Sequence, residues 1–205
     1  MIVIVDYGLG NLASILNMLR KIGVAARISS NPGEIESAEK LVLPGVGSFD
    51  SGMTALEERG LVPVLTRKAL HGGTPLLGLC LGMQLLTRGS EEGRRPGLGW
   101  IDATTVRFRF PQDTPRLPVP HMGWNRIRVE RGSPILAALP DPSRFYFVHS
   151  YHVVCGSSDA VLATTSYGYD FPSVIGRGNL VGTQFHPEKS HRFGMALLRS
   201  FAGMA

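Results

Sequence analysis

Short apolar runs alternate with helix-like patterns along the first part of the chain. Ile2–Val5 is an uninterrupted apolar run, which is typical of a strand buried on both faces in a parallel sheet. Apolar residues then recur at helical spacing over residues 12–22, between Asn11 as the expected cap and Gly23 as the expected end. The same criteria predict further strands at residues 24–28, 40–43 and 76–79. They predict helical segments at residues 52–59 and 61–71, and a helix that follows the last of these strands and runs to residue 86.

The second half of the chain has a different pattern, with few helical segments. Short β-branched or aromatic runs occur at residues 104–108, 125–129, 145–148, 161–165 and 180–185. Residues 109–120 hold four prolines and are expected to form a long connection, and residues 191–201 a closing helix. We therefore predict an α/β fold of three layers, in which helices flank a doubly wound, mostly parallel sheet with an antiparallel or mixed extension. A length of 205 residues fits a single domain over residues 1–205.

Composition and charge narrow the class of protein. The two cysteines lack metal-ligand spacing and cannot build a disulfide framework, so free thiols and a cytoplasmic location are expected. The start, MIVIVDYG, has no basic region before its apolar run, and no apolar run approaches the roughly 20 residues of a membrane helix. The net charge of +5 comes from scattered arginines without a nucleic-acid motif. These features favour a solvated surface or an acidic protein partner, and argue against nucleic acid or membrane binding.

A glycine pattern at the first turn resembles a dinucleotide-binding fingerprint but lacks its second half. Gly8, Gly10 and Ala13 fit G-x-G-x-x-A between a strand and a helix. That site needs a carboxylate for the ribose hydroxyls about 20 residues further on, where this chain has RISSN. The glycines are therefore interpreted as a tight turn.

Candidate chemistry begins at Cys80. The segment GLCLG has the form G-x-C-x-G, the cysteine version of a nucleophile elbow between a strand and a helix. Such a turn exposes the sulfur above the strand and directs the first N–H groups of the helix, including that of Leu81, towards a developing oxyanion. The positive end of the helix also stabilises a thiolate. On this pattern alone, an inert core cysteine stays the alternative.

A base for the thiol is expected at the end of a later strand, in QFHPE. His186 and Glu188 are two residues apart, so on extended backbone their side chains share a face. His186 would take the thiol proton, and Glu188 would orient the imidazole and stabilise its charged form. The PGVG segment after the third strand supplies Val46 or Gly47 as a second oxyanion donor, with a simple tight turn as the alternative.

These motifs together resemble a known family. GLCLGMQLL with GTQFHPEKS is similar to the class I glutamine amidotransferases, and DYGLGN, PGVGSF, PHMGWN and YFVHSYHV narrow the likeness to the glutaminases of histidine biosynthesis. The resemblance implies that Cys80 attacks the side-chain amide of glutamine, that His186 relays protons and that Glu188 supports His186. It implies no cofactor and no metal. The glutamine pocket is expected to include Gly47, Gln84, His149, Ser150 and Tyr151.

The resemblance also implies a partner. Such glutaminases pass ammonia to a barrel-shaped cyclase subunit, for which this chain leaves no room, so a heterodimer is expected. Asn11, Trp124 and Lys189 are expected at the docking face. One departure from the family pattern is His191, where a glycine is expected. The alternatives are a glutaminase subunit of pyridoxal phosphate or anthranilate synthase, or a cysteine peptidase on a similar scaffold.

Overall fold

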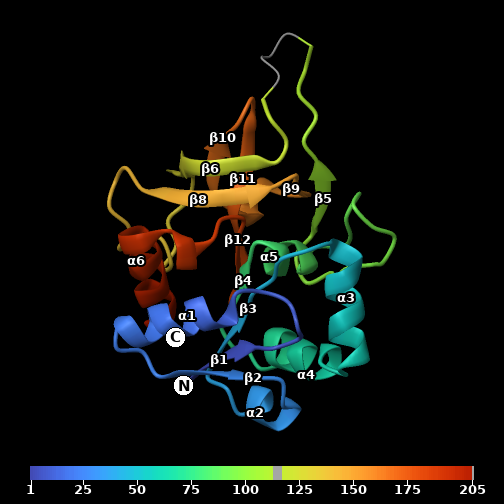
Figure 1. Cartoon of the computed structure of the whole chain (residues 1–205), viewed down its shortest axis with the longest axis vertical. Helices are drawn as coiled ribbons and strands as arrows, with labels where there is room; N and C mark the ends of the chain where they lie inside the picture. Colours follow the sequence, from blue (N-terminus) through green and yellow to red (C-terminus); the bar gives the residue numbers. More distant parts are fainter. Residues whose placement is uncertain (113–116, 205) are drawn as a thin grey trace.

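A computed structural model describes residues 1–112 and 117–204 (Figure 1). Its central sheet has the strand order β2-β1-β3-β4-β12-β11-β10-β7. The parallel part consists of β2 (Ala26–Ser29), β1 (Ile2–Val5), β3 (Lys40–Leu43), β4 (Leu76–Leu79) and β12 (Leu180–Thr183). The antiparallel part consists of β11 (Asp170–Arg177), β10 (Val161–Ser166) and β7 (Arg128–Val129). The predicted parallel sheet with an antiparallel extension is confirmed.

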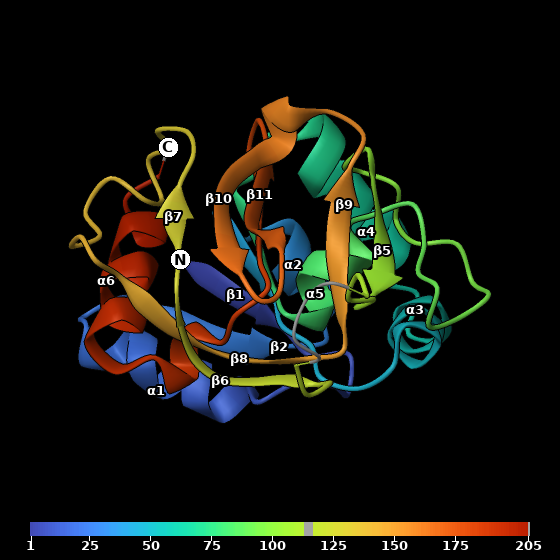
Figure 2. The same ribbon diagram turned by 90° about the horizontal axis from the view of Figure 1, so that it is seen from above.

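Helices cover both faces of the parallel strands, as Figures 1 and 2 show. On one face lie α1 (Leu12–Lys21) and α6 (His191–Ala202), and on the other α2 (Pro32–Glu36), α3 (Phe49–Glu58) and α4 (Val62–Thr66). Successive strand residues serve the two cores alternately: Val3 and Val5 pack on one face, and Ile2 and Ile4 on the other. This two-sided burial explains why the strands are continuously apolar.

Two strand pairs lie over the carboxyl ends of the parallel strands (Figure 1). One pair is β5 (Ala103–Arg107) with β9 (Tyr151–Cys155), and the other is β6 (His121–Arg126) with β8 (Arg144–His149). The backbone N–H of His186, just past β12, donates to the Tyr146 carbonyl of β8 at 2.9 Å. This contact joins the middle of β8 to the segment that follows β12, at the carboxyl edge of the sheet.

Several predicted elements differ from the structure in extent. The helix predicted over residues 61–71 divides into α4 and a π-helical turn at Arg67–His71 (η1). The run at residues 125–129 is split, because Ile127 is buried between the ends of β6 and β7. Strand β11 was not predicted, since Pro172 and a glycine interrupt its pattern. The connection predicted over residues 109–120 lies partly outside the described residues.

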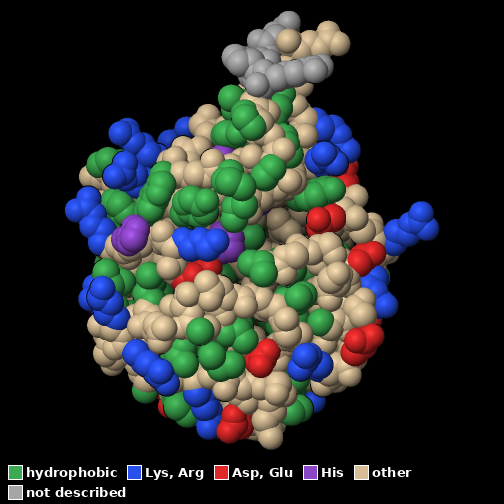
Figure 3. Space-filling model, in the orientation of Figure 1, with side chains coloured by type: hydrophobic (Ala, Val, Ile, Leu, Met, Phe, Trp, Pro, Cys, Tyr) green, Lys and Arg blue, Asp and Glu red, His purple; other side chains and the backbone are tan. Residues whose placement is uncertain are grey.

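Charged side chains are dispersed over the surface. On the face drawn in Figure 3, lysine and arginine side chains are scattered and form no continuous basic block. Several arginines pair with acids, as in the contact of Arg67 with Glu36 at 2.7 Å, and exposed pairs of this kind contribute little to stability. Across the described ranges, every helix is too short or too polar to cross a membrane.

Candidate active site

The elbow predicted at Cys80 is present between β4 and α5 (Leu81–Leu85). Cys80 has φ +52°, a left-handed backbone conformation that residues with a side chain rarely adopt. A Cβ on Gly78 would lie 2.7 Å from the Gly82 carbonyl oxygen, and a Cβ on Gly82 would overlap the Leu43 carbonyl oxygen. The turn therefore requires glycine at both positions. Backbone strain of this kind at a reactive side chain is a mark of functional sites.

The Cys80 side chain lines a cavity of about 330 Å³ at the carboxyl edge of the sheet. The cavity brings together the predicted elbow, the PGVG loop, the turn between β8 and β9, and His186. Its lining consists of Val46, Gly47, Cys80, Leu81, Gln84, Glu92, Pro120, Val148, His149, Ser150, Tyr151 and His186. Every residue predicted for the oxyanion site and the glutamine pocket is in this set.

His186 and Glu188 form a buried pair next to the cavity. His186 Nδ1 lies 2.8 Å from Glu188 Oε1, and each side chain is 3% exposed. The extended backbone expected for both residues is found only at His186, because Pro187–Lys189 turns into a 3₁₀ helix (η3). Glu188 thus reaches the imidazole through a turn and not along a strand, since Pro187 at the first helical position favours that turn.

The environment of His186 favours its charged form. Burial lowers the pKa of the ring, but the neighbouring Cys80 and Glu188 outweigh this effect and raise the pKa above its ordinary value. His186 Nε2 is buried and has no hydrogen-bond partner in the part of the chain that the structure describes. An imidazole with one nitrogen fixed by a carboxylate and the other unpartnered beside a thiol is arranged for proton transfer with that thiol.

The two candidate sources of oxyanion donors flank Cys80. Leu81 is the first residue of α5, so its N–H has no acceptor within the helix. Gly47 has φ +112°, and Val46 beside it is 44% exposed. Tyr7 fixes the start of this loop, because its hydroxyl donates to the Pro44 carbonyl at 2.6 Å. Which of these N–H groups binds an oxyanion stays a prediction.

Comparison with known proteins identifies the family. The sequence model of the class I glutamine amidotransferase family matches residues 3–203 of this chain. A HisH 2 subunit of imidazole glycerol phosphate synthase from Methanococcus maripaludis is 51% identical over 205 residues, 100% of both chains. A HisH 2 subunit from Pseudomonas aeruginosa is also 51% identical, over 98% of both chains. The chain belongs to the class I glutamine amidotransferases. It is an enzyme, and its full-length relatives are HisH subunits.

Solved structures agree with the amidotransferase fold. A crystal structure of a glutamine amidotransferase has a TM-score of 0.75 at 21% identity, over 98% of this chain and 99% of that chain. A structure of PurLQS from Thermotoga maritima has a TM-score of 0.74 at 17% identity, over 98% of this chain and 96% of that chain. At these identities the likeness concerns the fold alone.

One acidic side chain lining the amidotransferase pocket was missed from the sequence. Glu92 lies in the loop after α5, and its carboxylate accepts the Phe49 N–H at the start of α3 at 2.8 Å. A bound amino acid presents an ammonium group, for which a carboxylate is the natural partner. That requirement calls for an acid in the pocket, but it does not select one among 16 aspartates and glutamates.

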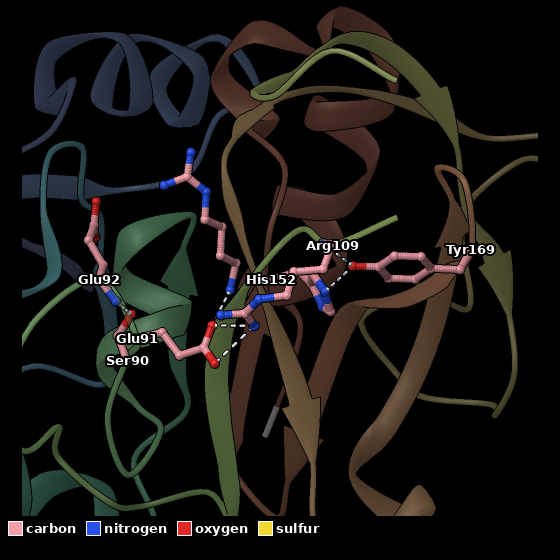
Figure 4. A network of polar contacts seen from close by, with 7 residues as sticks. Ser90, Glu91, Glu92, Arg109, His152 and Tyr169 are labelled. Carbon is pink, nitrogen blue, oxygen red and sulfur yellow. Dashed lines mark hydrogen bonds and ion pairs between the residues drawn. The ribbon is translucent and has the colours of Figure 1, made fainter. Parts of the chain in front are cut away.

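The loop that carries Glu92 is held in place by the contacts of the preceding residue, Glu91. The Glu91 carboxylate accepts the Arg107 backbone N–H at 2.9 Å and Arg109 Nη1 at 2.8 Å, and the Ser90 hydroxyl accepts the Glu92 N–H at 3.1 Å (Figure 4). Glu91 and Glu92 therefore point to opposite sides of the loop. These backbone and side-chain contacts hold Glu92 towards the pocket of the amidotransferase.

The residues predicted for docking lie near the same edge. Trp124 is 44% exposed and stacks on His191, with ring centroids 5.7 Å apart. Lys189 is exposed, and its ammonium lies 5.6 Å from the centroid of the Tyr146 ring. Asn11 is exposed and caps α1, which packs against η3. His191 has φ +47°, which explains why glycine was expected there.

Proposed function

We propose that the chain hydrolyses glutamine through Cys80, His186 and Glu188, and delivers the ammonia to a separate cyclase subunit of imidazole glycerol phosphate synthase in a cytoplasmic heterodimer. The observation that carries the proposal is the cavity of about 330 Å³, which joins an elbow cysteine, a carboxylate-bound histidine and an acid. Glutamine would bind with its ammonium at Glu92 and its side-chain amide at Cys80. A peptidase that cleaves within a chain would have no such use for Glu92, because residues inside a peptide lack a free ammonium group.

The first half of the reaction forms a thioester. His186 Nε2 takes the proton of the Cys80 thiol, and the sulfur attacks the amide carbon to give a tetrahedral oxyanion. Backbone N–H groups of Leu81 and of Val46 or Gly47 would stabilise that oxyanion. The imidazolium returns its proton to the amide nitrogen, the carbon–nitrogen bond breaks and ammonia leaves. Glu188 stabilises the imidazolium throughout these steps.

The second half regenerates the enzyme. His186 takes a proton from water, which attacks the thioester carbon, and the sulfur departs from a second tetrahedral oxyanion. The products are glutamate and free Cys80. Gln84, His149, Ser150 and Tyr151 would hold the substrate in line with the sulfur, since positioning of reactants supplies much of the rate enhancement of such reactions.

Replacement of the nucleophile tests the assignment directly. Cys80→Ala is expected to abolish glutamate release, while the folded chain still binds the cyclase and added ammonia still supports cyclisation. Alanine fits the elbow because it is smaller than cysteine. Glutamate release by this variant would overturn the proposal, and the matched variant Cys155→Ala, in β9, is expected to keep its activity.

The docking face would lie at the same edge, where ammonia can cross without meeting solvent and becoming ammonium. Trp124 is a large exposed ring of the kind that anchors interfaces. Lys189 has no acidic partner within the described ranges, so it is available to a carboxylate of the cyclase. Lys189→Ala is expected to weaken both complex formation and cyclase-stimulated glutaminase activity. Parental values for both would remove Lys189 from the docking face.

A further inference from the structure

Gln184 is a buried polar residue that the reaction above does not use. It follows β12, two residues before His186, and is fully buried. Its Nε2 lies 3.7 Å from Cys80 Sγ, within range of a hydrogen bond to sulfur, and its Oε1 accepts from Gln84 Nε2 at 3.1 Å. Burying an amide is costly unless its polar atoms are paired. Here one of its partners is the nucleophile.

The Tyr151 carbonyl fixes the orientation of the Gln184 amide through Gln84, because a carbonyl oxygen can accept a hydrogen bond but cannot donate one. Gln84 Nε2 donates to the Tyr151 carbonyl at 3.3 Å and to Gln184 Oε1 at 3.1 Å. A flipped Gln84 would set its oxygen against the Tyr151 oxygen. A flipped Gln184 would set its NH₂ against that of Gln84 and its oxygen against the sulfur. The Gln184 N–H is therefore held towards Cys80.

Two neutral histidines support the Tyr151 carbonyl from the other side. His149 Nδ1 donates to it at 2.8 Å, so His149 Nε2 is left to accept from His121 Nδ1 at 3.0 Å. His121 Nε2 in turn accepts from Asn125 Nδ2 at 3.3 Å. Burial lowers the pKa of His149 to about 3 and that of His121 to about 4, which keeps both rings neutral. All the donors in this chain of hydrogen bonds point in a consistent direction.

We propose that Gln184 is a positioning residue for the nucleophile, whose amide N–H donates to the Cys80 sulfur and favours the thiolate. A thiolate accepts a hydrogen bond more strongly than a thiol does, so a fixed donor stabilises the reactive form. The same donor restricts where the sulfur points inside the pocket. The hydrogen bond involves only Gln184 and Cys80, whereas its effect on catalysis rests on the proposed glutaminase function.

The test follows the reactivity of the Cys80 thiol as a function of pH. In a Cys155→Ala background Cys80 is the only thiol, and its alkylation by iodoacetamide is followed by intact mass. Gln184→Met keeps length and volume but removes the donor. We expect the pH midpoint of alkylation to rise by about one unit, the effect of one hydrogen bond to a charged group. We also expect kcat for glutamine to fall by up to about tenfold with KM nearly unchanged, because the thiolate fraction falls.

Thr183→Val is the matched control. Thr183 precedes Gln184 in the chain and is also fully buried, and its hydroxyl donates to the Phe185 carbonyl at 3.3 Å and not to the sulfur. The substitution therefore removes one buried hydrogen bond that does not involve Cys80. Its alkylation midpoint is expected to equal that of the parent. An equal shift in Thr183→Val would assign the effect to general loosening of the strand end and overturn the proposal.

A second variant covers the case in which Gln184→Met does not fold. Gln184→Glu keeps the shape, still accepts from Gln84 and places a carboxylate beside the sulfur, so an upward shift of the alkylation midpoint is again expected. An unshifted midpoint in the folded variants overturns the proposal, even if the parent hydrolyses glutamine. A parent that alkylates normally but releases no glutamate when mixed with the cyclase would instead overturn the proposed function, and the midpoints would still decide the role of Gln184.

Discussion

Mild acid is expected to destabilise the protein through its two buried neutral histidines. His121 is 3% and His149 6% exposed, and among the described residues neither ring forms a hydrogen bond with a carboxylate. Burial lowers the pKa of His121 to about 4 and of His149 to about 3, whereas in the unfolded chain both have the ordinary value of about 6.5. The unfolded state therefore binds protons that the folded state does not. Stability from these groups is present above pH 6.5 and is lost as the pH falls towards the folded pKa values.

The size of the effect follows from the pH interval. Lowering the pH from 7 to 5 reduces the free energy of unfolding by about 2 kcal/mol for each histidine, and so by about 4 kcal/mol for the pair. His152, whose pKa burial also lowers, adds to the loss. His186 opposes it, because its raised pKa gives stability that is complete only below pH 6.5, but this regains less than about 1 kcal/mol over the interval. A net loss of about 3 kcal/mol or more is expected. Carboxylates with a lowered pKa, such as Asp50 and Glu91, lose their contribution only at lower pH.

Urea unfolding at pH 7 and pH 5 measures the difference, with the slope of free energy against urea as a check that the transition is unchanged. His149→Gln is expected to reduce the pH-dependent loss by about 2 kcal/mol, the contribution of that one histidine. His71→Gln, which changes an exposed histidine, is expected to retain the full loss. Equal stability of the parent at both pH values, or an unchanged loss in His149→Gln, would refute the reasoning.

Three further predictions concern the pocket and the elbow. Glu188→Gln is expected to lower kcat for glutamine less than His186→Ala does, since Glu188 orients and stabilises while His186 carries the proton; equal losses would contradict this division. Glu92→Gln is expected to raise KM for glutamine more than it lowers kcat, and steady-state kinetics showing only a kcat effect would exclude ammonium binding at that position. Gly82→Ala is expected to prevent folding, because the new Cβ overlaps a backbone oxygen, whereas Gly132→Ala, with open space around it, is expected to give a native circular dichroism spectrum.

Local patterns predict the parts of this molecule in which neighbouring residues decide the structure. The apolar run at β1 and the helical spacing after Asn11 were found because burial on a sheet or against a helix repeats with a fixed period. The elbow at Cys80 was found because two glycines at fixed offsets are required by backbone clashes. Its chemistry follows from the same few residues.

Contacts between distant segments were not accessible to the same reasoning. Glu92 faces the pocket because Glu91 is held by Arg109, 18 positions later, and no local period marks that contact. Gln184 contacts Cys80 across 104 positions, and only the pairing of β12 with β4 brings them together. The 3₁₀ turn at Glu188 was missed since two-residue spacing alone does not distinguish an extended segment from a turn.

The neutral histidines and the charged His186 are connected by electrostatics. Charges on His121, His152 or His186 would each disfavour a charge on His149, in addition to the cost of its burial. If His149 were protonated, it would also repel the ammonium of a bound glutamine and would compete with it for Glu92, since both line one cavity. The site can therefore carry its positive charge on His186, where Glu188 compensates it, only if the rest of the pocket wall is polar without carrying a second positive charge. Amide groups and neutral imidazoles linked in one hydrogen-bond direction satisfy that requirement, which gives a physical reason for Gln84, Gln184, His149 and His121 to occupy these positions.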